Sequence, residues 1–177
     1  MDIVITTARL RLRRWKTADL PVFETMNRDP EVMEYFPAPL SPEATLKLYD
    51  RIQKHFEEHG FGLYALEETV SGAFIGFTGF MIPSFSASFT PCVEIGWRLR
   101  KEHWGKGLAT EAALACLEYG FGELGFTEVL SFTSIHNRRS ENLMRRIGME
   151  KAGEFLHPNL APDDRLSLHI LYRITKR

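Results

Sequence analysis

The segment spanning residues 92–134 constrains the fold of this chain more than any other part of the sequence. It begins with an apolar run typical of a strand (92–99), passes through a loop containing Gly105 and Gly107, and then spaces its apolar side chains as a helix does (108–121). A second β-rich run follows at residues 129–134. A strand, a glycine loop, a helix and a second strand usually make a parallel strand pair. The segment therefore predicts an α/β fold.

Other segments predict a mixture of strands and helices around this unit. Leu10 and Leu12 alternate with arginines, which is the period-two pattern of a strand with one solvent-exposed face. Ser41 and Pro42 are typical of a helix start, and Gly60 is typical of a helix end. We expect strands at residues 8–13, 62–66, 73–82, 92–99, 129–134, 150–155 and 166–174, and helices at 17–26, 42–58, 108–121 and 139–147, within a single mixed α/β domain over residues 1–177.

Charge and cysteine content narrow the classes of function. The 22 Lys and Arg residues nearly balance the 23 Asp and Glu residues, so no overall field favours nucleic acid or an anionic membrane as a partner. No apolar stretch has the length of a signal peptide or of a membrane span of ~18 residues, so we expect a cytoplasmic protein. Cys92 and Cys116 lack metal-ligand spacing, and we expect both to be small buried hydrophobes without a catalytic role.

The glycine loop is the clearest candidate for a binding site. Successive backbone N–H groups that open a helix form a nest for an anion, and the positive end of the helix dipole adds to it. Gly105 and Gly107 would let the backbone approach a pyrophosphate closely. The two glycines could instead serve only a tight strand-to-helix turn. Their spacing matches neither a P-loop nor a dinucleotide-binding G-x-G-x-x-G motif.

The loop resembles motif A of the GNAT family of N-acetyltransferases, whose pattern is Q/R-x-x-G-x-G/A. Residues 104–109 read Trp-Gly-Lys-Gly-Leu-Ala, with Trp104 where the family has Gln or Arg. This substitution, together with residues 7–13, 94–97, 137–140 and 147–149, is similar to the subgroup that acetylates N-terminal alanine or serine residues of ribosomal proteins. Because the nest consists of backbone amides, the Trp costs at most one side-chain contact.

The resemblance implies a GNAT-like fold, with a mixed, mostly antiparallel twisted sheet of about seven strands, one splayed parallel pair and about four helices. It implies acetyl-CoA as co-substrate, without a metal, and places the pantetheine arm between the splayed strands. The backbones of Trp97 and Leu99 would pair with this arm, and Asn137 would bind near its amide end. The cofactor-binding residues that it implies are Trp97, Arg98, Leu99, Trp104, Gly105, Lys106, Gly107, Leu108, Ala109, Thr110, Asn137 and Ser140.

Acetyl transfer to an amine needs a base for the ammonium, a donor to the oxyanion and an acid for the departing thiolate. Glu94 is the candidate base, because an apolar strand would raise its pKa, although it could instead pair with an Arg as an ordinary strand carboxylate. The Tyr that is the acid in many family members corresponds to Met144, and the resemblance to the subgroup implies Ser140 as proton donor. Asn137 and Ser140 could also be helix caps only.

The acceptor would be a primary amine, either on a small molecule or at a peptide N-terminus, and the protein a monomer or homodimer. Phe36, Phe85 and Glu94 are the candidate acceptor-binding residues. Two other functions stay open. The chain could bind coenzyme A without catalysis, or it could be a zinc hydrolase, because His55 and His59 match an H-x-x-E-H pattern.

Overall fold

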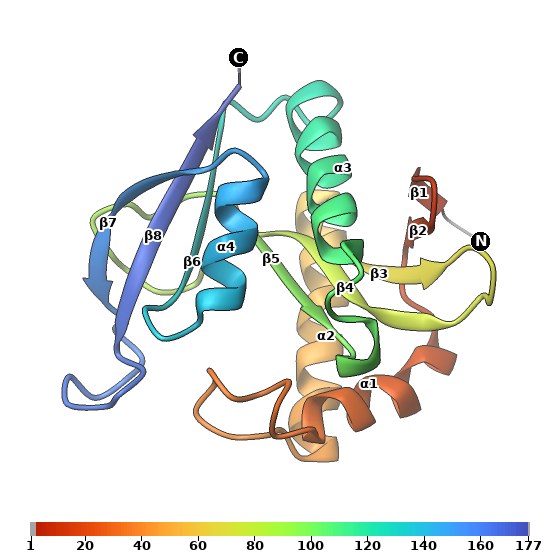
Figure 1. Ribbon diagram of the computed structural model, residues 1–177, viewed down its shortest axis with the longest axis horizontal. Coiled ribbons are helices and arrows are strands. Elements are labelled where there is room, and N and C mark those ends of the chain that lie inside the picture. The colour runs from red at the N-terminus through yellow and green to blue at the C-terminus, as the bar shows by residue number, and fades with distance from the viewer. Residues whose placement is uncertain (1–2, 177) are drawn as a thin grey trace.

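The computed structural model describes residues 3–176, which form an eight-stranded sheet with helices on both faces (Figure 1). The strands are β1 (Ile3–Thr6), β2 (Leu10–Arg13), β3 (Leu63–Glu68), β4 (Phe74–Met81), β5 (Glu94–Leu99), β6 (Glu128–Ser134), β7 (Glu150–Leu156) and β8 (Leu168–Thr175). The helices are α1 (Leu20–Arg28), α2 (Pro42–His59), α3 (Leu108–Gly122) and α4 (Arg138–Arg146), with short 3₁₀ helices η1 (Thr17–Asp19) and η2 (Lys101–His103).

The sheet has the order β1-β2-β3-β4-β5-β6-β8-β7. All neighbouring strands are antiparallel except β5 and β6, which run parallel on either side of the α3 crossover. The prediction of one parallel pair in a mostly antiparallel sheet is therefore confirmed. The strand beyond the expected seven is β1, whose sequence Ile-Val-Ile-Thr shows no clear alternation of apolar and polar side chains. It reaches β2 through a turn in which the Thr7 N–H donates to the Leu10 carbonyl at 2.9 Å.

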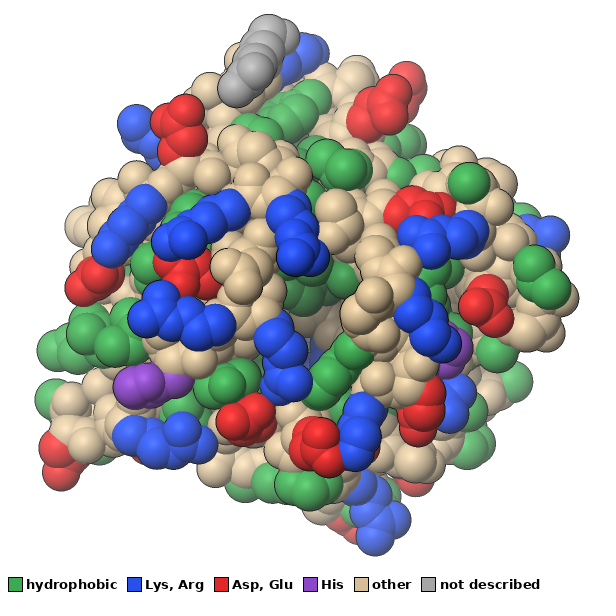
Figure 2. Space-filling view, in the orientation of Figure 1, with side chains coloured by type: hydrophobic (Ala, Val, Ile, Leu, Met, Phe, Trp, Pro, Cys, Tyr) green, Lys and Arg blue, Asp and Glu red, His purple; other side chains and the backbone are tan. Residues whose placement is uncertain are grey.

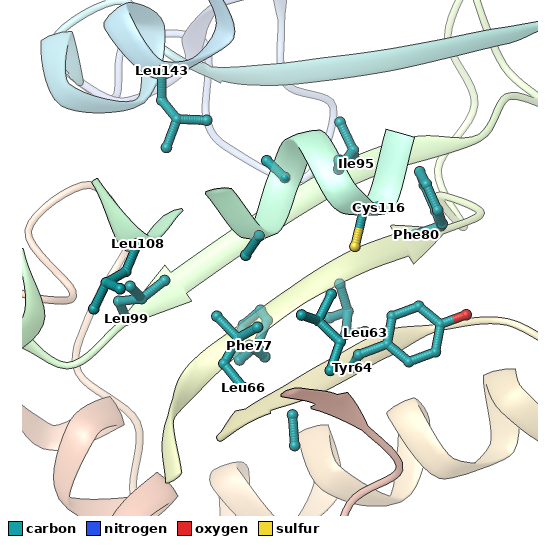
Figure 3. Packing of buried hydrophobic residues seen from close by; sticks show 14 of the residues in the cluster. Leu63, Tyr64, Leu66, Phe77, Phe80, Ile95, Leu99, Leu108, Cys116 and Leu143 are labelled. Atoms are coloured by element: carbon teal, nitrogen blue, oxygen red, sulfur yellow. The ribbon is translucent and has the colours of Figure 1, made fainter. Parts of the chain in front are cut away.

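Helices α3 and α4 lie on one face of the sheet, and α1 and α2 lie on the other (Figure 1). The side chains of α3 pack onto β4 and β5, where Leu108 and Cys116 meet the apolar side chains of the sheet (Figure 3). Cys116 is fully buried as predicted, whereas Cys92 is partly exposed. Within residues 3–176, no helix combines the length and the apolar character that a membrane span needs.

Helix α2 has the ends that its sequence predicts. The Ser41 hydroxyl accepts a hydrogen bond from the Ala44 N–H at 3.1 Å, and Pro42 occupies the first turn. Gly60 closes the helix with φ 77°, in the left-handed region that favours glycine. The helix runs behind the sheet in Figure 1, and Arg51 is an exposed residue of this helix.

A buried ion network joins the first strands to the start of α1. The Arg13 guanidinium donates to Asp19 through two hydrogen bonds of 2.8 Å and to Glu67 through one of 2.7 Å. Arg13 and its two partners are all buried. Glu67 also receives Lys16 at 3.3 Å. Since each charge has a partner, the network fixes η1 against β2 and β3.

Candidate functional site

The parallel strands β5 and β6 separate shortly after they meet. Their one register pair within residues 3–176 joins Glu94 to Leu130, and the Ser131 hydroxyl then donates to the Ile95 carbonyl at 2.9 Å. Past this point the two strands do not pair. The structure thus contains the splayed parallel pair that the family resemblance implies.

The backbone of β5 turns polar groups toward this opening. The Gly96 carbonyl accepts a bond from β4, whereas the Ile95 carbonyl faces β6. Because successive residues of a strand turn their polar groups to opposite edges, the N–H and C=O groups of Trp97 and Leu99 face the opening as well. An extended ligand arm could therefore add to β5 at Trp97 as another strand would.

The glycine loop enters α3 with two residues in the left-handed region. Gly105 has φ 71°, and Gly107, which is the N-cap of α3, has φ 74°. A Cβ at Gly105 would meet no atom within 4 Å, so the space over the loop is open. The backbone N–H groups of Leu108, Ala109 and Thr110 lie in the first turn, where a helix offers them no carbonyl partner. With the helix dipole, these groups suit an anion.

Arg9 is a residue of this site that the sequence analysis missed. Its Nη1 donates to the Lys106 carbonyl at 2.8 Å, and its Nε donates to the Glu111 carboxylate at 2.6 Å. Glu111 also accepts the Thr7 hydroxyl at 2.6 Å. The other nitrogen, Nη2, lies 3.6 Å from the place where a Cβ of Gly107 would be. No local pattern links Arg9 to a helix 102 positions later.

Trp104 fastens the glycine loop to the end of β5. Its indole Nε1 donates to the Leu99 carbonyl at 3.0 Å. The guanidinium of Arg139, from α4, lies over the indole at 4.2 Å from the ring centroid and forms an ion pair with Glu34 at 3.0 Å. The side chain that departs from the family pattern therefore links the loop to α4 through a cation–π contact.

Asn137 and Ser140 lie together at the start of α4. The Asn137 side chain caps the helix by accepting the Ser140 N–H at 3.2 Å, and it donates to the Thr133 hydroxyl at 3.0 Å and to the Ser140 hydroxyl at 3.1 Å. The Ser140 oxygen also accepts the Trp97 indole N–H at 3.3 Å. The capping interpretation thus fits Asn137. Because the Ser140 oxygen accepts two bonds, its own hydrogen is available to a third partner.

Glu94 and Arg98 occupy the face of β5 opposite to α4. Trp97 contacts Ser140 on the α4 face, whereas the Arg98 Nη1 donates to Asn27 of α1 at 2.7 Å. Side chains two residues apart share a face of a strand, so Glu94 and Gly96 point the same way as Arg98. The Arg98 side chain therefore lies away from the glycine loop, and only its backbone is near the opening.

The two charged groups are strongly perturbed by their surroundings. Burial raises the pKa of Glu94 to about 8, although the positive charge of Arg51 opposes this. Burial, together with the positive charge of Arg51, lowers the pKa of Arg98 to about 10. Within residues 3–176, Glu94 has no ion-pair partner, so the alternative of an ordinary paired strand carboxylate does not apply.

The two candidate aromatic residues lie in different surroundings. Phe36 packs against Arg98, whose guanidinium is 4.3 Å from its ring centroid, and it is 41% exposed. Phe85 instead joins an aromatic cluster over β6, β7 and β8, with ring centroids 5.6 Å from Phe132 and 4.7 Å from His157. The structure thus brings Phe36, but not Phe85, into contact with Arg98.

His55, the first histidine of the α2 pair, is engaged in two backbone hydrogen bonds. The His55 Nδ1 lies 2.8 Å from the Phe61 carbonyl, and its Nε2 accepts the Ile82 N–H at 3.0 Å. Neither ring nitrogen has a free lone pair for a metal, since one is protonated and the other accepts a bond. This geometry argues against the zinc-hydrolase alternative.

The surface over the opening suits an anionic ligand. Figure 2 shows the face that bears α3 and α4, which is hollowed near its centre and has Lys and Arg side chains around the hollow. A separate groove of about 760 Å³ lies between β1 and α3, lined by residues such as Ile5, Leu114 and Tyr119. None of the candidate catalytic residues lines that groove.

Comparison with known proteins identifies relatives over most of the chain. The profile of a family described as "Acetyltransferase (GNAT) domain" matches residues 9–150. The protein YkkB of Bacillus subtilis is 32% identical over 146 residues, which are 82% of this chain and 84% of that protein. The [ribosomal protein uS5]-alanine N-acetyltransferase of Escherichia coli is 26% identical, over 97% of this chain and 90% of that enzyme.

A solved structure is similar over nearly its whole length. It is the spermidine N-acetyltransferase of Vibrio cholerae in complex with CoA and spermine, which aligns with a TM-score of 0.75 and 21% identity over 96% of each chain. At this level of identity the alignment speaks for the fold alone.

Proposed function

The chain belongs to the GNAT acetyltransferase family, and on this basis we propose that it transfers the acetyl group of acetyl-CoA to a primary amine by direct attack in a ternary complex. Members of this family are acetyl-CoA-dependent acyltransferases. The observation that supports the proposal most is the placement of two features. The anion nest opens α3, and Glu94 lies at the point where β5 and β6 separate, without an ion-pair partner in the described chain.

The residues around the opening fit coenzyme A. The open space over Gly105 and the free N–H groups of residues 108–110 would receive the pyrophosphate, with the Arg9 guanidinium beside it. The Trp97 backbone would pair with the pantetheine arm, and the Asn137 amide lies on the opposite wall. Acetyl-CoA supplies the activated acetyl group; the side chains of this protein position it and move protons.

Glu94 would act as the base. Its carboxylate accepts a proton from the ammonium of the acceptor, directly or through a water, because a pKa of about 8 matches it to an amine near neutral pH. The free amine then attacks the thioester carbon, the C–S bond breaks, and the nitrogen releases its remaining extra proton to solvent to give the neutral amide. Glu94 returns the proton to solvent after the product leaves.

Ser140 would act as the acid. Its hydrogen is free while its oxygen accepts bonds from Trp97 and Asn137, and two donors at the oxygen make that hydrogen a better donor to the departing thiolate. The serine regains a proton from solvent. Met144, at the position of the Tyr in other members, is 1% exposed, and its thioether has no proton to donate.

The proposal is tested by calorimetric titration with acetyl-CoA and by acetyl-CoA consumption with a panel of amines. We expect binding with a stoichiometry of one per chain and turnover with at least one amine. Absence of binding at millimolar acetyl-CoA would overturn the proposal. Binding without any turnover would instead favour the alternative of a catalytically silent coenzyme A-binding module over residues 1–177.

A further inference from the structure

The face of β5 that carries Glu94 offers space for a small acceptor. Gly96 lies between Glu94 and Arg98, and a Cβ there would meet only the Glu94 Oε1, at 3.9 Å. At a rise of ~3.3 Å per residue, the Cα atoms of Glu94 and Arg98 are about 13 Å apart. A small molecule lying over Gly96 could therefore contact the carboxyl with one end and the guanidinium with the other.

Arg98 is a cation without a counter-ion. Its Nη1 donates to the neutral Asn27 at 2.7 Å, and its guanidinium lies 4.3 Å from the ring centroid of Phe36 and 5.3 Å from that of Phe77. Within residues 3–176 it forms no ion pair, and its buried Nε has no hydrogen-bond partner. A desolvated charge left in this state is unfavourable unless a ligand of opposite charge binds to it.

Arg51 adds a second positive charge to the same region. It is exposed on α2, and its positive charge opposes the rise in the pKa of Glu94 and contributes to the lowered pKa of Arg98. Within residues 3–176, no acidic side chain forms an ion pair with Arg98, and the carboxyl of Glu94 on the same face, with a pKa of about 8, is mostly protonated at neutral pH. The region is therefore positive where the acceptor would bind.

We infer that the acceptor is a small amine that also carries an anionic group, and that Arg98, helped by Arg51, binds this group while the amine lies at Glu94. The inference rests on the proposed function. A guanidinium binds carboxylates and phosphates through charge-assisted hydrogen bonds, and among the described contacts of Arg98 only Nη1 has a hydrogen-bond partner, the neutral Asn27.

The inference separates this protein from polyamine acetyltransferases. Spermidine and spermine carry a second ammonium several bonds from the reacting nitrogen, and that charge would lie beside Arg98 and Arg51. An ammonium beside two guanidinium groups in a partly desolvated site is strongly repelled, because all three groups are positively charged. A polyamine should therefore be a poor acceptor here, in contrast to the named substrate of the Vibrio cholerae enzyme.

Matched amines test the inference on the wild-type protein. The anionic set is β-alanine, 4-aminobutanoate, 6-aminohexanoate and 3-aminopropylphosphonate, and the neutral partners of the three carboxylates are their primary amides. Spermidine represents the polycations. We expect kcat/KM for the best carboxylate to exceed that of its amide by about tenfold or more, as for one charge-assisted pair. The phosphonate shows whether carboxylate or phosphate chemistry is preferred.

Variants identify the group that recognises the anion. Arg98→Gln keeps a donor for Asn27 and removes the charge, and we expect it to abolish the preference for the anionic amine. Arg51→Gln should reduce the preference, and because Arg51 is exposed on α2 this change does not disturb the core. Lys54→Gln, which removes an exposed charge from the same helix, is the control and should leave the preference unchanged.

The outcomes separate this inference from the proposed function. Equal or better turnover of the amides or of spermidine would overturn the anionic acceptor and leave the acetyltransferase proposal intact. The same holds if coenzyme A binds but no anionic amine in the set reacts. If Arg98→Gln lowered kcat/KM equally for charged and neutral amines, Arg98 would act on the pKa of the amine and not on the anionic group. This result would also overturn the inference. Failure to bind acetyl-CoA would reject the proposed function itself.

Discussion

The indole Nε1 of Trp97 donates to the hydroxyl of Ser140 at 3.3 Å, and this bond connects β5 to the start of α4. It joins the two walls of the opening in which acetyl transfer is proposed. Asn137 donates to the same oxygen at 3.1 Å. The hydroxyl is thus held from two sides with its hydrogen unassigned, which is the arrangement a proton donor needs.

Replacing Ser140 by Ala should lower kcat by about 10²-fold or more, the usual contribution of a positioned general acid, with little change in acetyl-CoA affinity. The helix should be almost unaffected, because Asn137 and not Ser140 provides the capping oxygen. Steady-state kinetics and calorimetric titration check the first claim, and thermal unfolding checks the second.

Asn137→Ala is the matched control, and it should lower the free energy of unfolding by about 1 kcal/mol through loss of the cap. Normal turnover in Ser140→Ala would assign the proton to water and leave Ser140 with a structural part only.

Replacing Gly107 by Ala should both destabilise the protein and weaken acetyl-CoA binding. A φ of 74° costs a residue with a Cβ about 1–2 kcal/mol, and the new methyl group would lie beside the Arg9 guanidinium in the anion nest. Calorimetric titration and denaturant unfolding measure the two effects separately.

Gly72→Ala provides the same backbone strain far from the nest, because Gly72 has φ 69° in the β3–β4 turn. We expect it to destabilise by a similar amount and to bind acetyl-CoA normally. If both variants lost affinity equally, global stability and not the nest would explain the effect.

Replacing Arg13 by Met should destabilise the protein by about 3–5 kcal/mol, because Asp19 and Glu67 would be left buried without their partner. The Glu67 pKa lies below its usual value, since the hydrogen bonds from Arg13 and Lys16 outweigh the opposing desolvation. In the variant, a lower pH should protonate the unpartnered carboxylates and so restore part of the lost free energy of unfolding. Urea unfolding at pH 5 and pH 8 measures this, and a loss below about 1 kcal/mol would show that the network contributes little.

Much of the fold follows from local sequence patterns. The glycines at 105 and 107 stand where the left-handed backbone requires them, and the alternation in β5 places Glu94 and Arg98 on one face. The contacts of Arg9 with Glu111 and of Arg139 with Trp104 could not be predicted, because they join segments far apart in sequence. Such contacts depend on how the elements pack, which no local periodicity records. The strand β1 was missed because its four residues, three of them apolar, give too short a pattern.

The protonation of Glu94 should make the rate of acetyl transfer depend on pH. Burial raises its pKa to about 8, so the proposed base is mostly protonated below pH 8. The rate should therefore rise with pH up to about 8 and then level off, provided that the acceptor is saturating. In Glu94→Gln this rise should disappear and kcat should fall by about 10²-fold, while acetyl-CoA affinity stays nearly constant.

The raised pKa of Glu94 also makes the stability of the folded protein depend on pH, and this can be measured without an activity assay. The folded carboxyl keeps its proton up to about pH 8, whereas the unfolded one loses it near its ordinary value of 4.5. Between these values the unfolded state binds fewer protons, so stability contributed by Glu94 is present below pH 4.5 and is lost as pH rises toward 8. Glu94→Gln should thus raise the melting temperature relative to wild type more at pH 8 than at pH 5. A melting-temperature difference that does not change with pH would contradict the raised pKa, and with it the assignment of Glu94 as the base.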